Sequence, residues 1–193
     1  MNSSAKVRKI TTMAMLVAVS VILVSVIHFP IFPAAAFLEY DPADIPIFIG
    51  TFIFGPAAGF AITVAASVVQ GLTVSAASGF IGILMHIAAT GSFVLVAGNI
   101  YHRKHTFKGA LLSLVCGVIT MTVVMCIWNY IMTPIFMGAP REVVAAMIVP
   151  VIIPFNLIKA GTNSIITVLV YKRLSTKIHE YIGDRKKKDN ADQ

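Results

Sequence analysis

The stretch "VVAAMIVPVIIPFNLIKAGTNSIITVLV", residues 143–170, decides the fold class of this protein. It is longer than the roughly 20 apolar residues that a helix needs to cross the hydrocarbon core of a bilayer. Lys159 is its only charged residue and lies near its middle. We interpret the run as a membrane-spanning helix. Because a charge inside a membrane is costly, Lys159 marks a candidate functional site.

The composition of the whole chain supports a membrane protein. Hydrophobic residues make up 58% of its 193 residues and charged residues only 12%, with a mean hydropathy of +0.88. Soluble domains average about 25% charged residues. The other long apolar runs lack the alternating polar pattern of β-barrel strands. The sequence therefore predicts an all-α integral membrane protein that forms a single membrane domain over residues 1–193.

The first apolar run, residues 10–27, follows three basic residues and in this respect is similar to a signal peptide. The run is long, and bulky residues follow it, so we expect it to be retained as a helix. The two cysteines, Cys116 and Cys126, lie about 15 Å apart along one helix, which is too far for a disulfide. Without a CxxC motif or a cluster of histidines and cysteines, no metal site is predicted.

Basic residues gather at residues 6–9, 103–108 and 172–188. The positive-inside rule places all three clusters on the cytoplasmic side of the membrane. This orientation accounts for the formal net charge of +7 without a nucleic-acid partner. Both termini are then cytoplasmic, and "HFPIFPAAAFLEYDPAD", residues 28–44, is an external loop.

Because residues 28–44 are expected outside and the basic cluster at 103–108 inside, the number of spans between them must be odd. Breaks are expected at the Gly-Pro turn of "FGPAAG", residues 54–59, and at the small-residue turn of "SAASG", residues 75–79. The prediction is six transmembrane helices, an external segment at 133–142 and a cytoplasmic basic tail at 172–193. The expected spans are about 10–28, 43–54, 57–74, 79–101, 109–132 and 143–171.

Asn156, Lys159 and Asn163 recur at i, i+3 and i+7, so they share one helix face. A lipid-facing stripe of two amides and an ammonium is implausible, so this face is expected to point into the bundle or into a cavity. The alternative is that these side chains only hold helices together by hydrogen bonds. We expect no acidic partner for Lys159 within a span. The candidate partners of Lys159 are then a bound polar ligand and the loop carboxylates Glu39, Asp41 and Asp44.

Two motifs carry a family resemblance. The segments "FLEYDPADIPIFIGTFIFGPAAGF", residues 37–60, and "PFNLIKAGTNSIITVLVYKRLS", residues 154–175, resemble the riboflavin-specific S components of energy-coupling factor (ECF) vitamin transporters. The resemblance implies a prokaryotic plasma-membrane protein that binds a vitamin from outside. It also implies two kinds of partner, a membrane T component and two cytoplasmic ATPases. The chain has no Walker A motif, which agrees with a subunit that has no ATPase or other catalytic activity of its own.

The resemblance also implies a flavin-binding site. It assigns Asn129, Asn156 and Lys159 to hydrogen bonds with the ring, and Asn163 to a deeper position. Amides both donate and accept, and an ammonium donates to a carbonyl oxygen, which suits the polar edge of a flavin. Trp128 is expected to stack on the ring, with the interfacial aromatic belt as the alternative. The external loop is expected to cover the ligand with Leu38, Glu39, Tyr40 and Asp41.

A further pattern concerns the partner. The family carries an Ala-x-x-x-Ala pattern in its first helix, which contacts the T component, and Ala14 and Ala18 match it. Small residues at i and i+4 let two helix backbones approach closely. The alternative is internal packing, because Ala57, Ala61 and Ala65 show the same spacing.

Other polar residues are expected to be structural. Asp44 is predicted to be the N-cap of the second span, and His28 and His86 to be hydrogen-bonded structural histidines. Gln70 and Thr73 stand near the outer end of the third span, where an aromatic residue would have suited flavin stacking.

Competing functions remain open at this point. One is transport of FMN as well as riboflavin. Another is an S component for a different vitamin or precursor, such as a thiamin precursor, pantothenate or a queuosine precursor. A stand-alone proton-coupled transporter would need a relay of titratable groups in the spans. An intramembrane enzyme is disfavoured because the chain has no GxSxG or HExxH motif.

Overall fold

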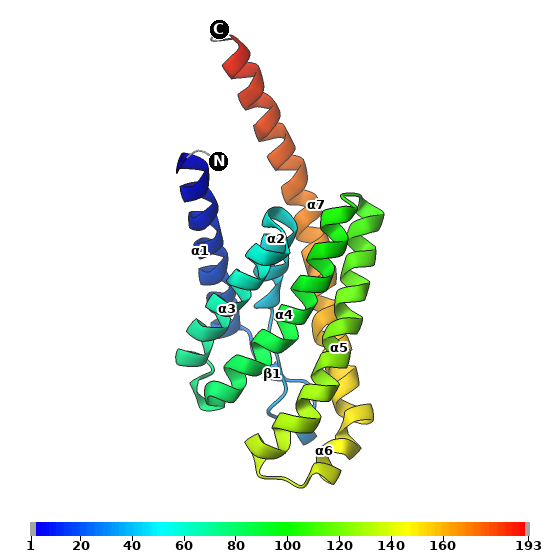
Figure 1. The fold of residues 1–193 in the computed structure, drawn as a ribbon. Helices are drawn as coiled ribbons and strands as arrows, with labels where there is room; N and C mark the ends of the chain where they lie inside the picture. Colours follow the sequence, from blue (N-terminus) through cyan, green and yellow to red (C-terminus); the bar gives the residue numbers. More distant parts are fainter. Residues whose placement is uncertain (1–2, 192–193) are drawn as a thin grey trace.

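The computed structural model describes residues 3–191, and within them the side chains of 4–33 and 35–172. The described chain is almost wholly helical (Figure 1). Its longer helices are α1 (Ser3–Val26), α3 (Pro56–Leu72), α4 (Gly79–Arg103), α5 (Phe107–Met137) and α7 (Ile153–Ala191). The shorter elements are β1 (Phe29–Pro30), η1 (Pro33–Ala35), β2 (Glu39–Tyr40), α2 (Asp44–Phe54), η2 (Ala76–Ser78), α6 (Arg141–Met147) and the π-helical turn η3 (Ile148–Ile152).

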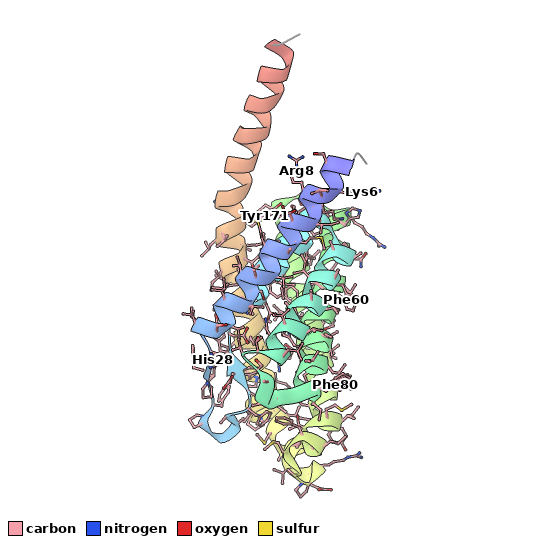
Figure 2. All side chains as sticks on the ribbon, turned by 90° about the vertical axis from the view of Figure 1, so that its left-hand side faces the viewer. Lys6, Arg8, His28, Phe60, Phe80 and Tyr171 are labelled. Carbon is pink, nitrogen blue, oxygen red and sulfur yellow. The ribbon has the colours of Figure 1, made fainter. Side chains whose placement is uncertain are left out.

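The helices pack as an upright bundle in which the start of α1 and the end of α7 lie toward the same end of the molecule (Figure 1). The β1–β2 hairpin and α6 lie toward the opposite end. Figure 2 shows Lys6 and Arg8 near the end at which Tyr171 lies, and His28 at the other end of α1. The basic clusters at 6–9 and 103–108 therefore belong to one end of the bundle, as the charge pattern predicts.

Four described helical stretches are long and apolar enough to cross a membrane. These are Ser4–Val26, Ala76–Arg103, Phe107–Met137 and Arg141–Lys172. The two helices between the first and second of them, α2 and α3, are apolar but shorter. Gly55 separates α2 from α3 with φ of +90°, a conformation that glycine adopts without a Cβ clash, and Pro56 opens α3 at its first position.

Two helix boundaries differ from the expected ones, and proline is involved in both. α5 continues through Pro134 to Met137 and ends at Gly138, in the left-handed conformation, so the segment 133–142 is largely helical rather than an open loop. The last helical stretch starts at Arg141 and contains the π-helical turn Ile148–Ile152, which includes Pro150. A wider turn accommodates a ring that has no N–H to donate.

The core lies where α2, α3, α4 and α5 meet. Phe48 of α2 stacks on Phe93 of α4, with ring centroids 3.8 Å apart. Gly98 allows α4 to approach the start of α3, because a Cβ there would lie 2.9 Å from the backbone of Pro56. The segment 27–43 between α1 and α2, which contains β1 and β2, is called the hairpin loop below. A smaller apolar cluster packs this loop, through Ala35 and Leu38, against α6 and the start of α7. The loop is thus part of the folded structure.

Candidate ligand-binding site

A cavity lies beneath the hairpin loop, between α3, α4, α5 and α7. About 960 Å³ of space free of protein atoms lies in this cavity and in the open solvent at its mouth. Its apolar wall includes Leu38, Met85, Met121, Met125, Phe136 and Phe155. Its polar lining residues are Glu39, Asp41, Ser67, Gln70, Ser75, Ser78, His86, Asn156 and Lys159. An apolar body with a few convergent polar groups is the usual form of a small-molecule site.

Lys159 projects from α7 to the base of the hairpin loop. Its Nζ lies 2.6 Å from Oδ2 of Asp41, and it donates to the carbonyl of Glu39 at 3.4 Å. Lys159 and Asp41 are each 9% exposed. A loop carboxylate is therefore the partner of the intramembrane lysine. The pair compensates two charges that would each be costly alone.

Asn163 lies one helical turn further along α7 and fastens the same loop. Its Nδ2 donates to the carbonyl of Asp41 at 3.0 Å and reaches Oδ2 of Asp44 at 3.4 Å. Its Oδ1 accepts from the hydroxyl of Tyr40 at 3.1 Å. Burial, and then the charge of Asp41, raise the pKa of Tyr40 above its ordinary value of 10.0, so this hydroxyl keeps its proton at neutral pH.

The predicted N-cap role of Asp44 is wrong. Asp44 is the first residue of α2, and the residue before it, Ala43, is helical in conformation and makes no capping side-chain bond. The fully buried carboxylate turns instead toward α4, where Oδ1 accepts from Thr90 Oγ1 at 2.7 Å and lies 3.3 Å from Nε2 of His86. Asp41 takes the local role, accepting from the backbone N–H of Ala43 at 3.0 Å.

His86 and Gln70 extend the polar network along the cavity wall. The second ring nitrogen of His86, Nδ1, lies 2.7 Å from Ser67 Oγ. Gln70 donates to Ser20 of α1 at 3.3 Å, and Ser20 donates to the carbonyl of Ala43 at 2.7 Å. The network thus joins α1, α3 and α4 to the end of the loop.

Comparison with known proteins places this bundle and cavity in a family. A family model described as the substrate-specific component of the ECF transporter matches residues 8–171. The chain belongs to the substrate-specific components, or S components, of ECF transporters. The family prediction made from the two motifs is therefore confirmed.

This S component also resembles individual relatives over most of its length. It is 32% identical over 174 residues to the riboflavin transporter RibU of Staphylococcus aureus (strain TCH60). The matched region covers 87% of this chain and 90% of that protein. It is 27% identical over 183 residues to the riboflavin transporter FmnP of Bacillus subtilis (strain 168), covering 91% and 96%. A solved structure of the S component of a bacterial ECF transporter matches with a TM-score of 0.79 at 31% identity, covering 90% and 98%.

Five of the residues predicted for the site of the S component line the cavity. These are Leu38, Glu39, Asp41, Asn156 and Lys159. Asn156 donates to the carbonyl of Ile152 at 2.8 Å, and its Oδ1 makes no bond to the described protein groups. This oxygen is available as an acceptor for a ligand. Tyr40 and Asn163 lie beside the cavity, where they hold the loop.

Asn129 and Trp128 lie outside the lining of this cavity. Asn129 is buried and bonds along its own helix, donating to the carbonyl of Met125 at 2.8 Å and accepting from Thr133 at 2.7 Å. Trp128 packs against the main core, and its indole N–H is buried with no hydrogen-bond partner among the described residues. In this arrangement the two residues do not contact the cavity.

Sequence reasoning missed the contribution of α3 and α4 to the site. Thr63, Ser67 and Gln70 recur at i, i+4 and i+7 in an otherwise apolar helix, which is the signal that would have placed them on one inward face. His86 is hydrogen-bonded through both ring nitrogens, in agreement with its expected structural role, yet it also lines the cavity. His28 bonds to the carbonyl of Val24 at 2.9 Å.

Ala14 and Ala18 are exposed on α1. The neighbouring Met13, Leu16 and Val17 pack against the core, so the two alanines face away from the bundle. The alanines of the similar pattern on α3, Ala57, Ala61 and Ala65, are exposed as well. Internal packing therefore explains neither pattern within the described chain.

Proposed function

We propose that this S component captures riboflavin in the cavity beneath the hairpin loop and delivers it for ATP-driven uptake. The observation that carries the proposal is the buried Asn156 and Lys159, which face a cavity with both apolar and polar walls in a chain whose relatives are named riboflavin transporters. The apolar wall suits the flat faces of the isoalloxazine ring, since aromatic and thioether side chains pack well against a ring.

The polar edge of the flavin has both acceptors and a donor. The ammonium of Lys159 donates to a carbonyl oxygen, and the free Oδ1 of Asn156 accepts from a ring N–H. Gln70 and Ser67, on the opposite side of the cavity, suit the hydroxyls of the ribityl chain. Asn129, Asn163 and Trp128, which the resemblance also assigned to the site, would reach the ring only after a rearrangement around the cavity.

We place the hairpin loop outside the cell and both termini in the cytoplasm, which is the orientation that the positive-inside rule favours. In this arrangement α1, α4, α5 and α6–α7 cross the plasma membrane, and α2 and α3 form a shorter pair that completes six spans. The loop is the lid of an outward-facing cavity. It is fastened to α7 through Asp41 and Tyr40.

The transport function depends on partners. A T component and two cytoplasmic ATPases supply the energy in this proposal, and this chain contributes binding without catalysis. The exposed Ala14 and Ala18 are the proposed contact with the T component, because small side chains allow close approach of a second helix.

A titration of riboflavin with the purified S component tests the function. Bound flavin loses its fluorescence when it stacks against protein groups, and flavin that copurifies gives the protein the yellow colour of the ligand. We expect saturable quenching of riboflavin fluorescence as the S component is added, and we expect excess thiamin or pantothenate not to reverse it. A colourless preparation that leaves riboflavin fluorescence unchanged would contradict the vitamin assignment. The same titration with FMN shows whether the site also accepts a phosphate on the ribityl chain.

A further inference from the structure

A second cavity lies outside the proposed vitamin site, in a groove between α5 and α7. Leu111, Val115 and Ile119 of α5 form one wall, and Leu157, Ile165 and Val168 of α7 form the other. The floor is low at Gly161, where an added Cβ would meet open space. The groove is almost wholly apolar and extends about 12 Å along α5, which suits an extended alkyl chain.

Two lysines stand at the same end of this groove. Lys108 is at i−3 from Leu111 on α5, and Lys172 is at i+4 from Val168 on α7, so each lies on the side of its helix that forms the groove. Both are exposed. α5 begins at the end of the bundle at which α7 leaves it, so the two side chains extend the groove toward a common membrane surface (Figure 1).

We propose that this groove binds an anionic phospholipid, with one acyl chain along α5 and α7 and the headgroup phosphate at Lys108 and Lys172. Basic residues at the ends of grooves between membrane helices bind anionic headgroups, and the apolar walls bury the chain. A neutral phospholipid fits the same groove but gains less from the lysines. The headgroup end of the groove lies at the end of the bundle opposite the hairpin loop, and no residue that lines the groove also lines the vitamin cavity.

The one polar group in the groove is the hydroxyl of Ser164, which is buried and has no partner among the described residues. A change of rotamer would let it donate to the carbonyl of Ala160, four residues earlier, so this hydroxyl tolerates an alkyl chain beside it. A second protein helix would instead offer it a carbonyl across the interface. The test therefore includes self-association as an outcome.

Native mass spectrometry of the full chain, purified in detergent, tests the site. The probes are dioleoylphosphatidylglycerol and dioleoylphosphatidylcholine, which share their chains and differ in headgroup charge. We expect the parent protein to retain the anionic lipid in preference. Lys108→Gln should weaken retention of phosphatidylglycerol about fivefold and that of phosphatidylcholine by clearly less. Gly161→Leu, which fills the groove floor, should weaken retention of both lipids.

Lys6→Gln is the matched control, because it removes the same charge from an exposed position on α1. An equal loss of phosphatidylglycerol from Lys6→Gln and Lys108→Gln would reduce the effect to net charge and overturn the site. Equal retention of the two lipids by the parent would do the same. If Gly161→Leu does not fold, Val115→Phe fills the groove from α5. A lipid-free dimer that either filling variant dissociates would assign the groove to a second copy of the chain instead.

Discussion

The ammonium of Lys159 lies 2.6 Å from a carboxylate oxygen of Asp41, so the centre of the last membrane helix is joined directly to the hairpin loop. The group proposed to bind the vitamin is therefore also the group that holds the loop closed. A ligand that takes a hydrogen bond from Lys159 competes with Asp41 or shares the ammonium with it. If the site binds the vitamin as proposed, this side chain links binding to the closure of the loop.

Lys159→Met should weaken riboflavin binding roughly 10- to 150-fold, because one charge-assisted hydrogen bond is worth about 1.5–3 kcal/mol. It also leaves Asp41 buried without its ion partner, so the variant should unfold at a lower temperature than the parent. Fluorescence quenching and thermal unfolding measure the two effects. The double variant Asp41→Asn/Lys159→Met should recover stability without recovering affinity. Parent-like affinity in Lys159→Met would show that the lysine is not a ligand.

Tyr40→Phe should loosen the loop without touching the cavity wall. The variant loses the hydrogen bond to Asn163, worth about 1 kcal/mol, so riboflavin should dissociate up to about fivefold faster in stopped-flow fluorescence. The raised pKa of Tyr40 means that the parent keeps this bond below pH 10.0 and loses it only as the pH rises through the higher folded value. Unchanged dissociation in the variant would show that the bond between Tyr40 and Asn163 does not limit opening of the loop.

Asp44→Ala should be more damaging than any single loop substitution. It leaves the side chains of Thr90, His86 and Asn163 without their shared acceptor, and each unpaired buried donor costs about 1–3 kcal/mol. Asp44→Asn keeps an oxygen for Thr90, so its unfolding temperature should lie between those of the parent and the alanine variant. An alanine variant as stable as the parent would show that the buried network contributes little.

Leu38→Cys tests the lid and the orientation together. Leu38 is only 4% exposed and lines the cavity, so an impermeant thiol reagent added to whole cells should label it slowly, through loop opening, and more slowly with riboflavin bound. Ala36→Cys, at an exposed position of the same loop that does not line the cavity, should label quickly with or without the vitamin. Labelling of both only in inverted vesicles would reverse the topology. Labelling of Leu38→Cys that riboflavin does not slow would rule out the lid.

Ala14→Leu and Ala18→Leu should leave riboflavin binding intact and impair uptake, because both positions face away from the bundle. Binding by the purified chain and uptake by cells that contain the whole transporter measure the two functions separately. Met15→Leu is a suitable control, since it is exposed on the same helix and adds no volume. A loss of binding in Ala14→Leu or Ala18→Leu would instead show that this side of α1 supports the fold.

The residues of α7 illustrate how far the sequence reaches. An apolar run of this length requires a membrane helix, and the spacing of Asn156, Lys159 and Asn163 requires that they share a face. Both statements depend only on local periodicity and the cost of an intramembrane charge. The motifs that contain these residues and the hairpin loop also carried the family assignment, which the family model confirms.

The partners of those residues depend on the tertiary structure. Asp41 and Asp44 are close in sequence, and composition does not distinguish them. Because of the turn into α2, Asp41 faces Lys159 and Asp44 faces His86 and Thr90 on α4. Ser67, Gln70 and His86 reach the cavity because α3 and α4 pack beside α7 and the loop, and Asn129 is directed along its own helix. The sequence alone determined the helix faces that carry polar groups, through the 3.6-residue period. Only packing between distant segments decided which of these groups meet, because those contacts depend on how the helices rotate and cross.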